Sequence, residues 1–438
     1  MTEGDTIRTS LRIATTIGVA AALLAPAGAN AQTYPEPKEP GKVAPKPPRP
    51  YETHTVCKSG PPARCDFRKI QAAVNAADAG DTIKVRRGVY KEAVRIDGRK
   101  KRYLKLIGNP KRPGRVVLDG SRRKQNGIAV NNADEVSVSG FKARNYRANG
   151  FFFTNLNGYT MNHLIAQETG VYGLYAFNTI GGRMLNSEAY YVNDGAFYIG
   201  QTPPQDKPVQ TVVRNVDGWG SPIGFSATNM RYVTITKSRF YNNAVGIVPN
   251  ALDSEKFPPP EKNVIVDNEI FWNNFNFHEG KPPFTPPPAT ATGSLVPLGT
   301  GILLLGGRDH RIENNRIYGN FLTGIAMIDG ILLPAGSPAV SLDRNIIRGN
   351  QFGLGGTDIN GRDVTFDGSG TGNCFELAPT DTAYPADKST VAGCSTAAVS
   401  SDARTQMLGW VAQGALSGWV KHEHPAKKGY KPLEVFNP

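Results

Sequence analysis

The sequence has little cysteine, tryptophan, methionine or histidine, and few runs of helix-favouring residues. Of 438 residues only 4 are Cys, 4 Trp, 6 Met and 6 His, whereas 48 are Gly. This composition argues against an all-helical protein, and the sequence has no Cys/His spacing typical of zinc sites. With 39% hydrophobic and 20% charged residues, the chain is expected to pack a core, as two or three domains or one repetitive body.

Long apolar runs are also lacking, apart from one near the start. Arg8 and Arg12 precede the apolar stretch 13–24, and Ala29-Asn30-Ala31 forms a small-x-small cleavage pattern. We therefore expect residues 1–31 to be a signal peptide cleaved after Ala31, and the protein to be secreted. A retained membrane anchor is the weaker alternative, and the mature chain has no second run long enough to span a membrane.

Acidic residues are fewer than basic ones. Lys and Arg total 50 against 37 Asp and Glu, giving a net charge of +13. A basic surface suits an anionic partner, which could be an acidic polysaccharide, a wall polymer or a nucleic acid. Nucleic acid is disfavoured because the chain is expected to be exported and contains no known nucleic-acid-binding module.

The four cysteines lie in two close pairs near the ends of the mature chain. An even count in an exported protein favours the disulfides Cys57–Cys65 and Cys374–Cys394. Free buried thiols are the alternative.

Composition divides the mature chain into three parts. Residues 32–54 are rich in proline and predict an extended spacer. Residues 55–398 are expected to form the folded body, which starts with an amphipathic helix over 66–78. Residues 399–438 predict a cap or tail with one more short helix, followed by a basic end that includes His422 and His424. These two histidines could bind a metal, but solvated side chains are the simpler interpretation.

The body contains an internal repeat in which a glycine opens a four-residue run that is usually followed by a turn residue. The repeat glycines are spaced by 23, 23, 22, 29, 22, 55, 23 and 29 residues, and they are Gly127, Gly150, Gly173, Gly195, Gly224, Gly246, Gly301, Gly324 and Gly353. A second row of Asn or Ser recurs in step, at Ser139, Asn162, Ser187, Ser238, Asn268, Asn315 and Asn345.

Three short strands fit into each period, with no helix between them. This pattern predicts an all-β protein, a right-handed parallel β-helix of about ten coils, in which each coil contacts only its neighbours. We expect Asn162, Asn268, Asn315 and Asn345 to form one inward ladder. A leucine-rich solenoid or a β-propeller would need other periods.

The segment FRKIQAAVNAADAGDTIKVRRGVYKEAVRI resembles the amino-terminal pattern of the pectin-lyase-like superfamily, with a capping helix and a G-x-Y-x-E element at Gly88, Tyr90 and Glu92. The resemblance covers roughly residues 55–395. It implies a secreted β-helix whose cleft lies over the glycine-initiated strands, but not one reaction, because the superfamily contains lyases, hydrolases, esterases, epimerases and adhesins.

Insertions flank the glycine-initiated strands, at 202–208, 252–262, 275–300 and 331–340. Loops raised around one face favour a groove there, although each loop alone is equally well explained as a tolerated insertion. His278 in the longest loop is a candidate lid or subsite residue.

Asp194 directly precedes the repeat glycine Gly195, in an Asn-Asp-Gly element that resembles one of the polygalacturonase motifs; the other three motifs are missing. Glu168 stands on the same turn one coil earlier. The two carboxylates could act as an acid/base pair, bind Ca²⁺, or be solvated turn residues. Lys207 could supply a cation across the groove.

A second candidate acidic pair is Asp329 and Asp358, which could take part in catalysis, recruit a cation or cap turns. A basic row comprising Arg183, Arg231, Arg308 and Arg362 could hold the carboxylates of an acidic glycan.

Two functions agree with these features. The first is a secreted lyase or glycoside hydrolase acting on an acidic or cell-wall polysaccharide. The second is a non-enzymatic extracellular protein that binds glycan. No cofactor is certain, Ca²⁺ is one candidate, and a monomer is expected.

Overall fold

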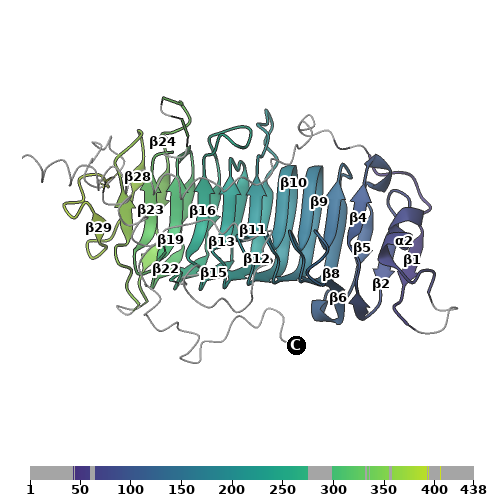
Figure 1. The fold of residues 1–438 in the computed structure, drawn as a ribbon. Helices are drawn as coiled ribbons and strands as arrows, with labels where there is room; N and C mark the ends of the chain where they lie inside the picture. Colours follow the sequence, from purple (N-terminus) through teal and green to yellow (C-terminus); the bar gives the residue numbers. More distant parts are fainter. Residues whose placement is uncertain are drawn as a thin grey trace, which may run out of the picture.

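In the computed structural model, short strands follow one another from Thr53 to Tyr384 and form one elongated stack of coils (Figure 1). The structure describes residues 43, 45–59, 65–274, 298–330, 333, 334, 336–354, 358–391, 393 and 405. The predicted signal peptide, His278, Cys394 and almost all of the predicted tail lie outside these residues. In the described parts no helix is long and apolar enough to cross a membrane.

Each coil contributes strands to three faces, and every strand pairing is parallel. Face 1 contains the glycine-initiated strands and the strands that pair with them at either end. It consists of β4 (Val94–Asp97), β7 (Ile128–Asn131), the starts of β9 (Phe151–Gln167) and β10 (Leu174–Tyr190), β11 (Gly195–Gly200), β13 (Ile223–Thr228), β16 (Val245–Asn250), β19 (Thr300–Leu305), β23 (Thr323–Ile328), β27 (Val364–Phe366) and β29 (Ala383–Tyr384).

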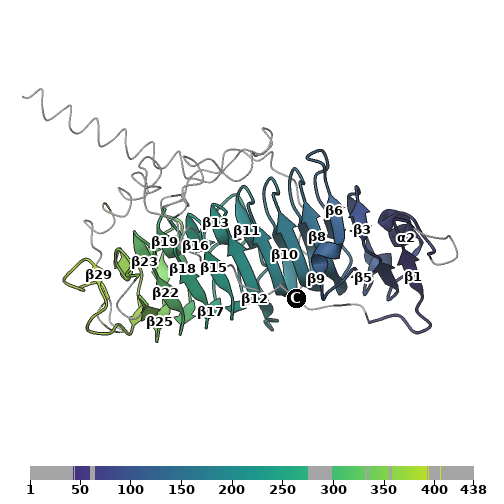
Figure 2. The ribbon, with the colours of Figure 1, turned by 90° about the horizontal axis from the view of Figure 1, so that it is seen from below.

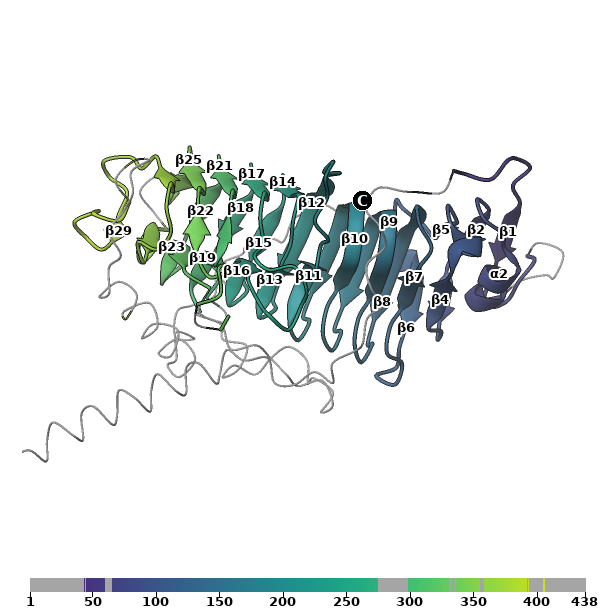
Figure 3. The same cartoon turned by 90° about the horizontal axis from the view of Figure 1, so that it is seen from above.

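Face 2 follows after a turn that is often long. It consists of β1 (Thr53–Val56), β2 (Thr82–Val85), β5 (Lys105–Ile107), the start of β8 (Val136–Arg144), the middles of β9 and β10, the start of β12 (Thr211–Trp219), β14 (Val233–Thr236), β17 (Val264–Val266), β21 (Arg311–Glu313), β25 (Ile346–Arg348) and β28 (Cys374–Phe375). Strands β12, β14, β17, β21 and β25 follow one another along one edge in Figure 3.

Face 3 follows after a tight turn and leads back to face 1. It consists of β3 (Gly88–Tyr90), β6 (Val116–Asp119), the ends of β8, β9, β10 and β12, β15 (Arg239–Tyr241), β18 (Glu269–Phe271), β22 (Arg316–Tyr318) and β26 (Gln351–Phe352). Strands β15, β18 and β22 lie in sequence in the view from below (Figure 2). A small separate pair joins β20 (Gly307–Arg308) to β24 (Leu342–Asp343). The fold is thus the predicted parallel β-helix.

The first coil is closed by the helix α2 (Ile70–Ala76), which buries Ile70, Ala73 and Val74. The G-x-Y-x-E element explains how the helix is held, because both carboxylate oxygens of Glu92 accept hydrogen bonds from the first backbone N–H groups of α2, at 3.1 Å each. Such groups have no partner within the helix. Two 3₁₀ turns, η2 (Arg99–Lys101) and η3 (Pro113–Arg115), lie in later turns of the first coils.

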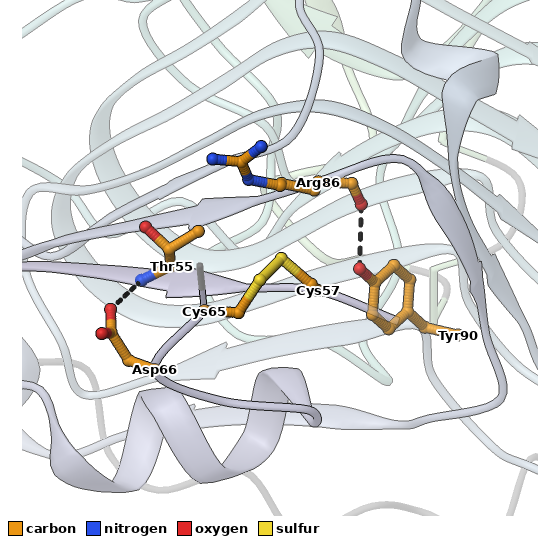
Figure 4. Close-up of a disulfide and its surroundings, with 6 residues drawn as sticks. All are labelled: Thr55, Cys57, Cys65, Asp66, Arg86 and Tyr90. Carbon is orange, nitrogen blue, oxygen red and sulfur yellow. Dashed lines mark hydrogen bonds between the residues drawn. A yellow bond between two sulfur atoms is a disulfide. The ribbon is translucent and has the colours of Figure 1, made fainter. Parts of the chain in front are cut away.

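The disulfide Cys57–Cys65 lies beside this cap, between β1 and the segment leading into α2 (Figure 4). The side chain of Asp66 accepts a hydrogen bond from the backbone N–H of Thr55, and Tyr90 donates one to the carbonyl of Arg86. The first predicted disulfide is therefore confirmed. Cys374 is also disulfide-bonded, but its predicted partner Cys394 lies outside the described residues.

Buried asparagines hold successive coils together at three corners. Between faces 2 and 3 the backbone N–H of each member donates to the side chain of the next coil's member, at 3.0 Å, along Ser238, Asn268, Asn315 and Asn350. A second ladder leads into face 2 through Asn263, His310, Asn345 and Asn373. A third leads into face 1 through Asn243, Asn273, Asn320 and Asn360.

The single predicted ladder is therefore partly wrong. Asn268 and Asn315 do stack, but Asn345 belongs to the ladder at the preceding corner and Asn350 takes the expected place. Asn162 is only half-buried and accepts a hydrogen bond from Asn186 on an outer row. The error arises because the three corners are only five residues apart in the later coils, so that the side chains of neighbouring corners are easily exchanged in a sequence alignment.

Substitution of Asn315 by Ala should destabilise the protein strongly. The change leaves the backbone N–H of Asn268 and the carbonyl of Ile265 buried without these partners. At about 1–3 kcal/mol for each unsatisfied group, we expect the free energy of unfolding to fall by about 2–4 kcal/mol in urea titrations. The control Asn75→Ala, on the exposed side of α2, should change it by about 0.5 kcal/mol or less. Equal effects of the two substitutions would contradict the ladder.

His310 makes the free energy of unfolding depend on pH. It is the one non-asparagine of its ladder, it is 1% exposed, and burial lowers its pKa to about 4. The unfolded chain takes up a proton near pH 6.5 but the folded chain does not, so stability is full above pH 6.5 and is lost as pH falls toward 4, by about 3 kcal/mol. His310→Asn, which retains a side-chain acceptor, should lose less stability between pH 7.5 and 4.5 than the parent in urea titrations. If the variant and the parent lose the same free energy of unfolding between pH 7.5 and 4.5, His310 does not have this role.

Candidate functional site

Glu168 and Asp194 lie on the same kind of turn, from face 3 to face 1, but not opposite one another. The N–H of Glu168 donates to the carbonyl of Tyr190, and the N–H of Asp194 donates to the carbonyl of Val171. The strand register therefore places Glu168 level with Tyr191 and Asp194 level with Val171. The two backbones are offset by three positions along the turn.

Glu168 is held on the face 3 side of this turn. Its carboxylate forms an ion pair with Arg122 at 2.7 Å and accepts a hydrogen bond from Gln167 at 2.8 Å. Asp194 opens face 1 directly before β11 and is half-buried. The two predicted catalytic acids thus stand at opposite ends of the turn.

The predicted basic residues do not form one row. Arg183 is exposed on face 2, whereas Arg308 lies in the turn from face 1 to face 2 and Arg362 in the turn from face 3 to face 1. Glu261 lies between Arg231 and Arg308 and pairs with both, at 3.1 and 2.8 Å. Lys207 is exposed in the loop between β11 and β12.

The second predicted acidic pair is also not formed. Asp329 follows β23 in the turn toward face 2, and its N–H donates to the side chain of Asp367 at 2.9 Å. Asp358 is exposed in the turn toward face 1. The reason is that Gly353 does not open a strand. The corresponding strand is β27, which begins at Val364 and pairs in register with β23, so Gly368 rather than Asp358 lies level with Asp329.

The outer side of face 1, where the resemblance implies a cleft, is apolar and buried. One cluster consists of Phe152, Tyr175, Phe177 and Tyr198, all 2–7% exposed. A second is built of aliphatic side chains, among them Val248, Leu303 and Ile328. The loop after β16 folds back over this side, since Glu255 accepts a hydrogen bond from Tyr198. Polar groups able to reach a substrate are few here.

The outer side of face 3 carries a charged row that the sequence patterns did not indicate. The row takes one residue from each successive coil, in register. From the first of these coils onward its members are Lys142, Ile165, Glu188, Asp217, Arg239, Glu269 and Arg316. Trp219 donates a hydrogen bond to Glu188 at 2.9 Å, and Arg239 forms an ion pair with Asp217 at 3.2 Å.

Two residues further along these strands lies an aromatic row. Tyr190, Trp219, Tyr241, Phe271 and Tyr318 stack nearly parallel, with ring centroids 4.6, 6.2, 5.1 and 4.9 Å apart. The rings cover one another's faces, so they form a rigid wall beside the charged row. Repeat alignment could have found both rows, because their members recur at the same offset after the buried positions of face 3.

The pKa of Lys142 is lowered and the pKa of Glu188 is raised, so the two values lie closer together than usual. The ammonium of Lys142 donates a hydrogen bond to the hydroxyl of Tyr190 at 3.2 Å, and partial burial lowers the pKa of Lys142. Burial raises the pKa of Glu188, although the Trp219 hydrogen bond opposes it. A less basic amine near a weaker acid is typical of acid/base sites.

Asp217 completes this part of the row but is less accessible. Its side chain is 3% exposed, and burial raises its pKa to about 7 in spite of Arg239. Asp217 is thus shielded from solvent, whereas Lys142, Glu188 and Tyr190, all half-buried, remain within reach of solvent.

Glu168 and Asp194 do not fit a Ca²⁺ site. In the part of the chain that the structure describes, no group of three or more His, Cys, Asp or Glu side chains could hold a metal ion. Glu168 is neutralised by Arg122 and offset from Asp194. Calcium prefers six or more oxygen ligands, which these two carboxylates do not supply.

The comparisons with known proteins agree with the fold. A family described as "Right handed beta helix region" matches residues 208–377. No curated protein matches the sequence. Among solved structures, the A-module of mannuronan C-5 epimerase AlgE6 from Azotobacter vinelandii is similar, with a TM-score of 0.50 and 16% identity over 72% of this chain and 92% of that chain.

Two further solved structures resemble the chain less. Alginate lyase from Paenibacillus sp. str. FPU-7 has a TM-score of 0.44 and 13% identity, over 72% of this chain and 99% of that chain. DFA-IIIase from Arthrobacter chlorophenolicus A6, solved in complex with GF2, has a TM-score of 0.46 and 12% identity, over 74% and 93%. The chain therefore has the right-handed parallel β-helix fold, which it shares with the epimerase A-module.

Proposed function

We propose that this protein is a polysaccharide lyase that acts on an anionic, uronate-containing glycan at the outer side of face 3. The observation that carries the proposal is the pair Lys142 and Glu188, half-buried beside Tyr190, with pKa values displaced in opposite directions. Similar solved structures include a mannuronan epimerase and an alginate lyase, and the net charge of +13 suits an acidic glycan.

The chemistry required is a β-elimination. A base removes the proton from the carbon next to the uronate carboxylate, the bond from the neighbouring carbon to the glycosidic oxygen breaks, and an acid protonates that oxygen. Lys142, with its lowered pKa, is the proposed base, Tyr190 positions it, and Glu188, with its raised pKa, is the proposed acid. General acid/base groups act best when their pKa values lie near the working pH.

Hydrolysis is less well supported. It would need two carboxylates flanking the bond, and the second carboxylate nearest to Glu188 belongs to Asp217, which is 3% exposed and paired with Arg239. A substrate could not reach it without breaking that ion pair.

Glu168 and Asp194 enter the proposal as residues at the edge of the same site. Glu168 lies level with Tyr191, next to Tyr190, and pairs with Arg122. A substrate carboxylate could replace Glu168 as the partner of Arg122, since arginine binds carboxylates through two parallel hydrogen bonds. Asp194 would contact only a glycan that crosses the turn toward face 1.

One observation favours a second function, glycan binding without turnover. Among the described residues, the outer side of face 1 is covered by apolar side chains that are 0–7% exposed, which are not groups that could catalyse proton transfer. In that case face 3 would hold the glycan but Lys142 and Glu188 would not act on it.

Export is part of the proposal. The predicted signal peptide and the Cys57–Cys65 disulfide both suit an oxidising extracellular environment, where uronate polymers would be met.

Glu188→Gln and Lys142→Gln should each reduce turnover of a uronate polymer by at least about a hundredfold, because each removes one proton-transferring group. The measurement is the ultraviolet absorbance of the unsaturated product, with reducing ends counted in parallel to detect hydrolysis. The matched control is Glu269→Gln, which lies in the same row but pairs with Arg316 and should retain parental activity.

Full activity of Glu188→Gln and Lys142→Gln would place the reaction elsewhere. Reducing ends without unsaturated product would replace the lyase by a hydrolase. No turnover of any glycan by the parent protein, with binding retained, would establish the second function.

Glu168→Gln and Asp194→Asn test the positions predicted from sequence. If Glu168 lies at the edge of the site, Glu168→Gln should change KM for the polymer several-fold and leave kcat nearly unchanged, because uniform binding rather than transition-state stabilisation is altered. Asp194→Asn should have the smaller effect. A hundredfold loss of kcat in either variant would instead make that carboxylate the catalytic group.

A further inference from the structure

The whole net charge of the protein comes from one short stretch. Residues 84–124 contain 16 Lys and Arg against 3 Asp and Glu, a difference of +13. The rest of the chain has 50 − 16 = 34 basic and 37 − 3 = 34 acidic residues, so it is neutral. A positive surface on this protein is therefore a local feature of the first coils.

The fold gathers many of these cations at one corner. Strands β2 and β5 are neighbours on face 2, and β3 and β6 are neighbours on face 3. The turns that join them, at 86–87 and 108–115, therefore lie side by side at the corner between these faces. We call this the basic corner; its members, all exposed, are Lys84, Arg86, Arg87, Lys105, Lys111, Arg112 and Arg115.

Within the described parts of the chain, these cations are not neutralised by ion pairs. Neither turn contains an Asp or Glu, and no ion pair between described residues involves any member of the basic corner. Elsewhere, arginines of the outer rows are paired, as in Arg144 with Asp119 and Arg316 with Glu269. Unpaired like charges repel one another, and an external polyanion would relieve that repulsion.

The basic corner lies next to the proposed active site. Val117 on β6 is in register with Lys142 on β8, and Arg115 directly precedes β6. Neighbouring strands are about 4.8 Å apart, so an extended anionic chain could lie along face 3 and reach both.

We infer that the basic corner is a non-catalytic subsite that binds the acidic groups of a uronate polymer and leads the chain to Lys142. Its binding role stands on the charge distribution alone, and only the leading of the chain to Lys142 rests on the proposed function. The polymer would be held by several exposed cations, so its affinity should fall steeply with salt.

The test compares two triple variants of the full chain that lose the same charge. Arg86→Gln/Arg112→Gln/Arg115→Gln removes three members of the basic corner. Arg214→Gln/Lys237→Gln/Lys262→Gln removes three exposed cations of later coils. Binding to polygalacturonate, to neutral dextran and to double-stranded DNA is measured at several salt concentrations, after thermal melting has verified folding.

The basic-corner variant should bind polygalacturonate at least about tenfold more weakly, since each cation near an anionic surface contributes about fivefold. Its salt dependence should be shallower, and the control variant should bind like the parent. Equal losses in both variants would mean that only net charge matters, which overturns the inference. If the protein binds DNA but not polygalacturonate, the inference is also overturned.

The test measures formation of the complex rather than formation of product, so this result is separate from the lyase proposal. If binding depends on the basic corner but no polymer is cleaved, the subsite stands and the proposed reaction fails.

Discussion

The structure depends on the close vertical contact between neighbouring coils. Every strand obtains its hydrogen bonds from the coils above and below, and buried asparagines do the same for the corners. The repeat glycines follow from the same constraint. A Cβ added at Gly246 or Gly301 would lie 2.5 Å from the carbonyl oxygen of the corresponding glycine in the next coil, closer than side-chain carbons approach. A rigid stack of this kind leaves only outward side chains and loops free to serve function.

Faces 1 and 3 carry different kinds of side chain on their outer sides. The outer side of face 1 forms a second apolar layer. The loop that carries Glu255 lies over this layer, where Glu255 accepts a hydrogen bond from Tyr198. Face 3 instead displays charges and stacked rings on its outer side, at fixed spacing from coil to coil. Partial burial there shifts the pKa values of Lys142 and Glu188 without removing these residues from reach. Strand-borne groups are positioned more firmly than loop-borne ones, which suits acid/base chemistry.

The fold could be predicted from the sequence because glycines and asparagines recur in it with the period of one coil. The parallel β-helix, its capping helix and the Cys57–Cys65 disulfide follow from patterns within a few residues of one another. The positions of residues within a coil are harder to predict. The repeat pattern places Asn345 at the wrong corner, and it aligns Asp358 with Asp329 although Asp358 comes before β27. Lys142 and Glu188 belong to no known motif, and only the stacking of coils brings these residues, 46 positions apart in the sequence, onto one row.

The central claim is that the glycan binds on face 3 and not on face 1. A crystal structure of the Glu188→Gln variant with a uronate oligosaccharide tests it most directly, because the variant should bind substrate without consuming it. We expect the sugar to lie along the charged row, with a glycosidic oxygen close to residue 188 and a uronate ring against Lys142 and Tyr190. An oligosaccharide bound over β11, β13 and β16 instead would contradict the account.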